Sequence, residues 1–223
     1  MDTIGQVHRI AFNLFGLHGT IAPKMLYMTW IVITILILLG FFGGRKLKDV
    51  PHGLQNFWEM IIGFFDEIVV STLDESGRKF TPMITTLFLF ICISNLLGMV
   101  PGLAEPTKYL STDLGLGLMI FVIVHYSAIK AKGFIGYLQS YCEPVFIFAP
   151  LNVIGELAKV VSHSFRLFGN ILGGSIIIVI LSYLTKYLGL PIFLQLFFGM
   201  FSGLIQAFVF TMLAVTYIAV ATK

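Results

Sequence analysis

Long apolar segments with very few charged residues occupy most of this chain, and they constrain its fold more than any other feature. Charged residues make up 11% of the 223 residues and apolar residues 57%, whereas a soluble domain carries roughly 25% charged residues. So few charges cannot cover the surface of a soluble protein of this size. Lipid must therefore be the solvent for most of the chain, and the sequence predicts an all-α membrane protein.

Five segments are apolar and long enough to cross a hydrocarbon core of ~30 Å. We predict membrane helices at residues 25–42, 80–100, 112–129, 144–188 and 191–221. The last two contain more residues than a perpendicular span requires, so we expect steep tilt, a kink, or a path partly along the membrane. The turn at Gly189 to Pro191 should join them into a hairpin.

Residues 54–73 differ because acidic side chains interrupt apolar residues that recur at helical spacing. This pattern predicts an amphipathic helix that lies at the membrane interface or packs on other helices. With no internal repeat and no linker, residues 1–223 form one membrane domain, and residues 1–24 form an external N-terminal segment.

The distribution of basic residues predicts the orientation. An outside N-terminus and an inside C-terminus would place eight basic residues in the inside loops and four outside, which fits the positive-inside rule. The inside residues are Arg45, Lys46, Lys48, Arg78, Lys79, Lys130, Lys132 and Lys223, and the outside residues are Arg9, Lys24, Lys108 and Lys186.

Residues 144–188 carry a polar stripe along one face of the predicted helix. It comprises Glu156, Lys159, His163, Arg166 and Asn170, which fall within roughly an 80° arc at about 100° per residue. Each charge at the bilayer centre costs roughly 2.5 kcal/mol or more, so the stripe must face a partner, another helix or water. The spacing of Glu156 and Lys159 also suits a simple ion pair, and a single histidine is more often packed than a relay.

Arg166 is the charge that packing explains least. Its guanidinium stays protonated at any accessible pH. The nearest candidate acid, Glu156, lies roughly 15 Å away along the helix axis. We therefore expect a carboxylate from another chain to be the partner of Arg166.

A weaker polar stripe follows residues 191–221. It comprises Gln195, Ser202, Gln206 and Tyr217, within about 60° of one another. Gly199 and Gly203, one helical turn apart near this face, would let another helix approach closely. Taken alone the stripe favours helix packing, but beside the Arg166 helix it predicts the second wall of a polar channel.

Other chemistry has little support in the sequence. Phosphate-loop, zinc-protease and nucleophile-elbow motifs are missing, and Cys92 and Cys142 form neither a metal-ligand spacing nor a disulfide framework. We therefore expect no cofactor, no metal and no nucleic acid. One alternative stays open: a stand-alone secondary transporter that binds an anionic substrate through Glu156, Lys159 and Arg166.

The segment Ser164-Phe165-Arg166-Leu167-Phe168-Gly169-Asn170 resembles the R-L-F-G-N signature of subunit a of bacterial F-type ATP synthases. The similarity extends roughly from Met25 to the end of the chain. Its further matches are residues 155–159, 95–102 and 206–210 with Tyr217, and the weaker Val50-Pro51 and Glu105-Pro106-Thr107.

The resemblance implies an ion-translocating stator subunit of the bacterial plasma (inner) membrane, which is not an enzyme alone. Two half-channels would carry protons, or Na⁺ in sodium-coupled members, to and from the carboxylates of a rotating c-subunit ring. Arg166 would face those carboxylates and separate the half-channels. The ion pathway would include Glu156, Lys159, His163, Asn170, Ser175, Ser202, Gln206 and Tyr217.

The implied partners are the c-subunit ring, the peripheral-stalk b subunits, the remaining synthase subunits and the lipid bilayer. One departure from the family pattern concerns the outer half-channel. Many members carry an acidic residue or a histidine at the position of Ser175 and an ionisable or polar residue near Gly199, whereas both positions are non-ionisable in this chain.

Overall fold

The computed structural model describes residues 10–14, 17–21, 23–44, 53–100, 103–141, 146–184, 193 and 196–222. Five of the helices in this part of the chain are long and apolar enough to cross a membrane, which confirms the predicted all-α membrane fold. The α-helices are α1 (Pro23–Gly44), α2 (Leu54–Leu73), α3 (Thr81–Leu97), α4 (Leu110–Tyr141), α5 (Ala149–Leu184) and α7 (Gly203–Thr222). The shorter elements are the 3₁₀ helices η1 (Glu75–Phe80), η2 (Pro106–Lys108) and η3 (Phe146–Phe148), and the π-helix η4 (Phe197–Ser202).

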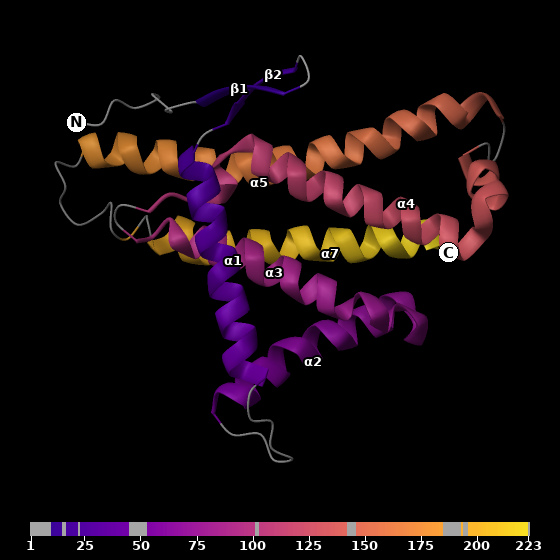
Figure 1. The fold of residues 1–223 in the computed structure, drawn as a ribbon, viewed down its shortest axis with the longest axis horizontal. Helices are drawn as coiled ribbons and strands as arrows, with labels where there is room; N and C mark the ends of the chain where they lie inside the picture. Colours follow the sequence, from indigo (N-terminus) through magenta and orange to yellow (C-terminus); the bar gives the residue numbers. More distant parts are fainter. Residues whose placement is uncertain are drawn as a thin grey trace.

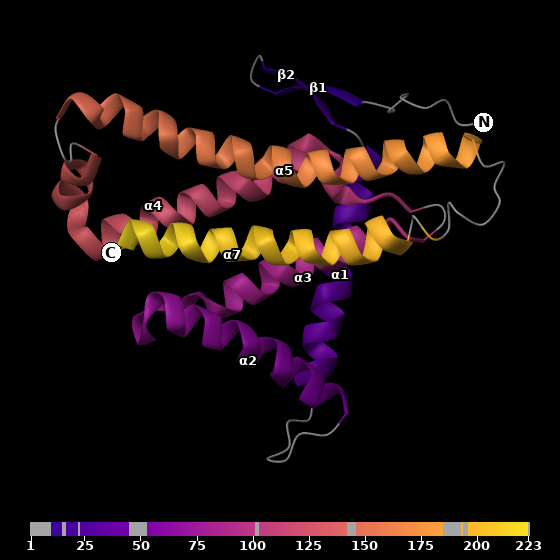
Figure 2. The ribbon, with the colours of Figure 1, turned by 180° about the vertical axis from the view of Figure 1, so that it is seen from behind.

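Helix α5 and the η4–α7 segment, the two long arms, run in opposite directions along the long axis of the molecule, and α1 runs crosswise to both (Figures 1 and 2). The 36 residues of α5 extend roughly 54 Å, well beyond a ~30 Å hydrocarbon core. A helix this long fits a bilayer only when it is steeply inclined. The length of α5 agrees with the expected excess over a perpendicular span, while the turn at Gly189 to Pro191 and residue Gln195 lie outside the described residues.

The N-terminal segment contains a feature that hydropathy did not predict. Strands β1 (Ile10–Leu14) and β2 (Leu17–Ile21) pair antiparallel, with Ile10 opposite Ile21 and Leu14 opposite Leu17. Two residues connect the strands, which is the commonest hairpin connection. Among the described residues this hairpin is the only β structure.

Helix α4 extends beyond the expected end at Ile129. It continues to Tyr141 through a break at Gly133, whose φ of 75° is a conformation that glycine adopts without steric cost. The residues after the break turn away from the axis of α4, as the end of that helix in Figure 1 illustrates. The basic pair Lys130 and Lys132 therefore marks a bend rather than the end of the helix.

Helix α2 buries one face against α3 and α7 and exposes the other. Phe65 and Val69 lie in the main hydrophobic core, while Asp66 pairs with Arg78 of η1 at 3.0 Å. The hydrogen bonds from Arg78 and then Thr81 hold the pKa of the Asp66 carboxyl below its usual range. The predicted amphipathic helix is therefore a packed element that closes one side of the bundle.

Candidate functional site

Arg166 points away from the helix bundle. The buried residues of α5, among them Ser164 and Leu167, face the neighbouring helices, whereas the Arg166 side chain is exposed. Within the described part of the chain, Arg166 forms neither an ion pair nor a hydrogen bond. The exposed side chains of α5 and α7 in this region are mainly apolar: Leu157, Val161, Phe165, Leu172, Ile176, Leu204 and Ile205. A permanent positive charge thus lies on an otherwise apolar surface.

One helical turn from Arg166, a hydrogen bond joins the two long arms. The Asn170 side chain donates from Nδ2 to Gln206 Oε1 at 2.7 Å. Gln206 is 5% exposed, and its own Nε2 has no hydrogen-bond partner among the described residues. This bond places Arg166 beside the junction of α5 and α7.

On the other side of Arg166, the same helix carries an ion pair and a buried histidine. Lys159 Nζ donates to Glu156 Oε1, so the ion pair that their spacing allowed is present. His163 is 3% exposed, and its ring centroid lies 3.8 Å from that of Phe210 and 5.8 Å from that of Tyr217. Neither ring nitrogen has a hydrogen-bond partner among the described residues, so His163 is packed between aromatic rings.

A cavity of about 500 Å³, the Tyr141 cavity, lies between α4, α5 and α7. Its polar lining includes His125, Lys132, Tyr137, Ser140, Tyr141, Asn152, Glu156, Lys159 and Tyr217. A smaller cavity of about 20 Å³ shares Glu156, Lys159 and Tyr217 with it and reaches His163. That volume is close to the 10–15 Å³ that one water requires. The polar cavity therefore continues along α5 only as a small, mainly apolar space that ends at His163, one helical turn from Arg166.

A hydrogen-bonded chain crosses the Tyr141 cavity. His125 Nδ1 lies 2.8 Å from the Phe121 carbonyl oxygen, which can only accept, so this nitrogen carries a proton. In a neutral ring Nε2 then accepts from Tyr141 OH at 3.2 Å, and Tyr141 OH lies 2.7 Å from Tyr137 OH. Asn152 fixes this end of α4 by donating to the Tyr141 carbonyl at 2.8 Å.

A second cavity, of about 390 Å³, lies on the far side of Arg166 along α5, and we call it the Glu105 cavity. Four predicted pathway residues line it: Asn170, Ser175, Ser202 and Gln206. Lys24, Asn95, Glu105 and Lys108 add further polar groups. The described residues that line this cavity and those that line the Tyr141 cavity do not overlap, and Arg166 lies between the two sets in α5.

Close approach of α3 and α7 forms one wall of the Glu105 cavity. A Cβ atom at Gly203 would lie 2.9 Å from Asn95 Cβ, and one at Gly199 would lie 2.8 Å from Met99 Cγ. Asn95 Nδ2 donates to the Gly203 carbonyl at 2.8 Å, and Thr107 Oγ1 donates to Asn95 Oδ1 at 2.9 Å. The close approach expected from the two glycines is therefore made by α3. Gly203 begins α7 directly after the π-helix η4, and π-helical turns are common at functional sites.

Three polar residues near the site were missed in the sequence. His125 lies inside the predicted span 112–129, and an ionisable residue within a membrane span is itself a sign of a functional site. Asp113, at the start of the same span, is 0% exposed, and its carboxylate oxygens have no hydrogen-bond partner among the described residues. Glu105 belonged only to a weak match with the family pattern, and nothing in a loop sequence shows which cavity its side chain enters.

Comparison with known proteins covers Arg166 and most of the residues that line the two cavities. The family model described as ATP synthase A chain matches residues 26–219. The chain is 39% identical over 195 residues to ATP synthase subunit a 3 of Pelobacter propionicus, covering 85% of this chain and 83% of the relative. It is 41% identical over 201 residues to ATP synthase subunit a of Desulfosudis oleivorans, covering 87% and 86%. It is 39% identical over 211 residues to ATP synthase subunit a of Trichlorobacter lovleyi, covering 92% and 90%.

Proposed function

Because the chain belongs to the ATP synthase A chain family, and is thus an ion-translocating subunit of the membrane sector rather than an enzyme alone, we propose that its two cavities are proton half-channels. In this proposal the half-channels meet at Arg166, which faces the carboxylates of a rotating c-subunit ring. The peripheral-stalk b subunits and the other synthase subunits complete the assembly.

The observation that carries the proposal is the exposed Arg166, which has no partner among the described residues and lies between two separate polar cavities. A charge on a lipid-facing surface costs roughly 2.5 kcal/mol or more. An anionic group from another chain removes that cost, and a carboxylate that passes along α5 supplies one. The junction of α5 and α7 is therefore the surface that the ring covers.

The charge of Arg166 also explains coupling. A fixed positive charge favours the ionised form of a nearby carboxylic acid, so a protonated ring carboxyl that reaches Arg166 releases its proton. The same charge repels a cation that moves directly from one half-channel to the other. Ions therefore cross only with ring rotation, at about 2.3 kcal/mol per charge for each 100 mV of membrane potential.

The orientation assigns each cavity to one side of the membrane. With the N-terminus outside a bacterial plasma membrane and the C-terminus in the cytoplasm, the loop between α3 and α4 that carries Glu105 lies outside. The end of α4 and the C-terminal end of α7 lie inside. The Glu105 cavity then forms the outer half-channel and the Tyr141 cavity the inner one.

Arg166→Ala in the assembled synthase tests this proposal. We expect ATP-driven proton pumping in membrane vesicles to be lost while ATP hydrolysis continues, because the barrier between the half-channels is gone. Lys130→Ala, which removes an exposed cation of α4, is the matched control and should pump normally. Normal pumping by the Arg166 variant would contradict the proposal. Pumping only in the presence of sodium would replace H⁺ with Na⁺, and anion uptake by the purified chain alone would favour the stand-alone transporter.

A further inference from the structure

Ser175 of α5 and Gly199 of η4 line the Glu105 cavity, and neither has an ionisable side chain. We propose that Glu105, which enters the same cavity from the loop between α3 and α4, is the group that takes up and releases protons there. This inference rests on the proposed function of the cavity as the outer half-channel.

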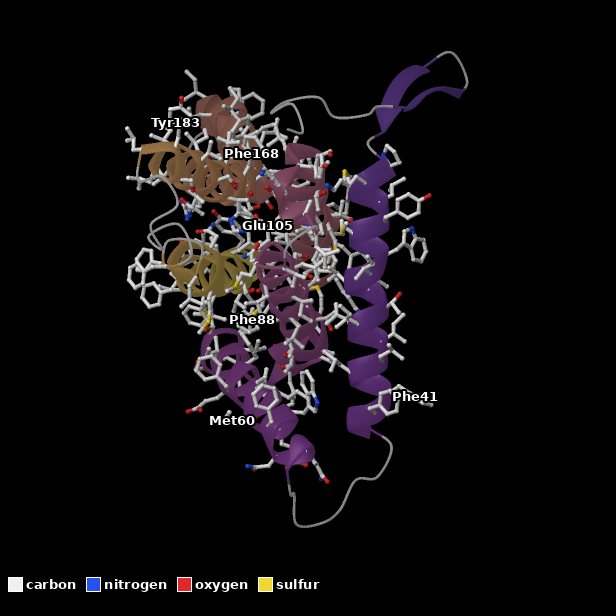
Figure 3. All side chains as sticks on the ribbon, turned by 90° about the vertical axis from the view of Figure 1, so that its left-hand side faces the viewer. Phe41, Met60, Phe88, Glu105, Phe168 and Tyr183 are labelled. Carbon is white, nitrogen blue, oxygen red and sulfur yellow. The ribbon has the colours of Figure 1, made fainter. Side chains whose placement is uncertain are left out.

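The charges that line the cavity single out Glu105. Among the described lining residues the charged side chains are Lys24 of α1, Glu105 itself and Lys108 of η2. Two lysines alone would repel a cation, so the carboxylate supplies the negative charge that draws protons in. Glu105 lies between α5 and α7, in the interior of the molecule (Figure 3).

The fold holds the Glu105 side chain in place. A Cβ atom at Gly98 would overlap the Glu105 carboxyl group, so the glycine at the end of α3 makes the room that this side chain occupies. Directly after Glu105, the turn η2 closes with Lys108 N donating to the Glu105 carbonyl at 3.2 Å. Thr107 then fastens the loop to Asn95 of α3. The loop is thus anchored to the wall of the cavity.

The protonation equilibrium of Glu105 suits exchange near neutral pH. Burial raises the pKa of Glu105 to about 7, against the lowering effect of the positive charge on Lys108. A carboxyl with this pKa is found in both forms at neutral pH, which is the condition for efficient proton transfer.

A polar route leads from Glu105 towards Arg166. The cavity of about 390 Å³ has room for several waters at roughly 30 Å³ each. Its opposite wall contains Asn170 and Gln206, hydrogen-bonded to each other at 2.7 Å, and Asn170 follows Arg166 by one helical turn. A proton taken up at Glu105 therefore has polar groups in reach as far as the site where a ring carboxyl is discharged.

The test measures proton flux through the membrane sector in vesicles that contain the complete synthase, with ATP-driven pumping and ATP hydrolysis measured on the same preparation. Glu105→Gln keeps the shape of the side chain and removes its titration. We expect proton flux to fall at least about 10-fold. The change in flux that the wild type shows near pH 7 should also disappear. Glu105→Asp should retain most of the flux. The matched control Glu67→Gln, at an exposed acid of α2, should have no effect.

A double variant separates proton transfer from a structural role. Ser175 lines the same cavity from α5, so Glu105→Gln combined with Ser175→Glu returns a carboxyl to it and should restore most of the flux. Unchanged flux in Glu105→Gln at all pH values would overturn the inference, and so would loss of flux without rescue. The Arg166→Ala result distinguishes this inference from the proposed function. If Arg166→Ala loses pumping while Glu105→Gln keeps normal proton flux, only the inference about Glu105 is refuted.

Discussion

Arg166 and Lys159 lie two helical turns apart on α5, yet only the charge of Lys159 is paired among the described residues. Lys159 pairs with Glu156 inside the chain and lies 5.6 Å from the Tyr217 ring centroid. Arg166 has no such partner among the described residues and faces outwards. One cation is therefore paired within the described chain, while the partner proposed for the other belongs to the assembly. The hydrogen bond between Asn170 and Gln206 lies next to this exposed charge and fixes the junction from which it projects.

Removal of the Gln206 amide tests the importance of that junction. Gln206→Leu leaves the exposed Asn170 Nδ2 without its acceptor, and the net loss of such a hydrogen bond costs about 0.5–1.5 kcal/mol. We expect a lower Tm for the solubilised protein and slower proton pumping by the synthase. Thr216→Val, at an exposed position of α7 whose hydroxyl bonds only within its helix, is the control. An unchanged Tm and pumping rate for the Gln206 variant would show that the bond does not hold the two helices together.

Glu105 makes stability depend on pH in a direction that can be worked out. Its folded-state pKa, about 7, lies above its ordinary value of 4.5, so the folded protein binds the proton more tightly than the unfolded chain. Below pH 4.5 both states are protonated and stability is unaffected by this group. As pH rises from about 4.5 through 7, the contribution becomes unfavourable and stability falls. Thermal unfolding at a series of pH values should show this decline in the wild type and a weaker one in Glu105→Gln; identical profiles would contradict it.

At the scale of whole elements, contacts between helices position the cavities that we propose as half-channels. The approach of α3 to α7 at Gly203 forms one wall of the Glu105 cavity. The approach of α4 to α5 is equally close, because a Cβ atom at Gly117 would lie 2.5 Å from Ser164 Oγ. Ser164 Oγ also donates to the Asp113 carbonyl at 3.0 Å. Both helix pairs thus meet through small residues and side-chain hydrogen bonds, as membrane helices commonly do.

A single methyl group at the first of these contacts should be costly. In Gly203→Ala the new Cβ would lie 2.9 Å from Asn95 Cβ, and overpacking of this kind typically costs about 1–3 kcal/mol. We expect a lower Tm and reduced pumping. Gly63→Ala on α2 has nothing within 4 Å of the new atom, and alanine is about 1 kcal/mol better than glycine in a helix, so this control should not lower the Tm. Equal Tm values for the two variants would refute the steric account.

At the scale of the whole molecule, hydropathy predicted the number and type of membrane helices because lipid imposes the same requirement on every span. Helical spacing likewise predicted that five polar residues lie on one helix: Glu156, Lys159, His163, Arg166 and Asn170. What the sequence left unpredicted depends on contacts between distant segments. The carboxyl of Glu105 reaches its cavity only because α3, α5 and α7 meet around it. Helix α4 continues beyond Ile129 to Tyr141, because Gly133 lets the chain bend at residue 133.

The central claim is that two cavities open to opposite sides of the membrane and meet at Arg166. Cysteines placed at Ser202 in the Glu105 cavity and at Ser140 in the Tyr141 cavity, with Cys92 and Cys142 replaced by serine, test it directly. The measurement is labelling by a membrane-impermeant thiol reagent, added from one side of vesicles of known orientation that contain the assembled synthase. We predict that Ser202→Cys is labelled only from the outside and Ser140→Cys only from the cytoplasmic side. Labelling of both cysteines from the same side would contradict the account.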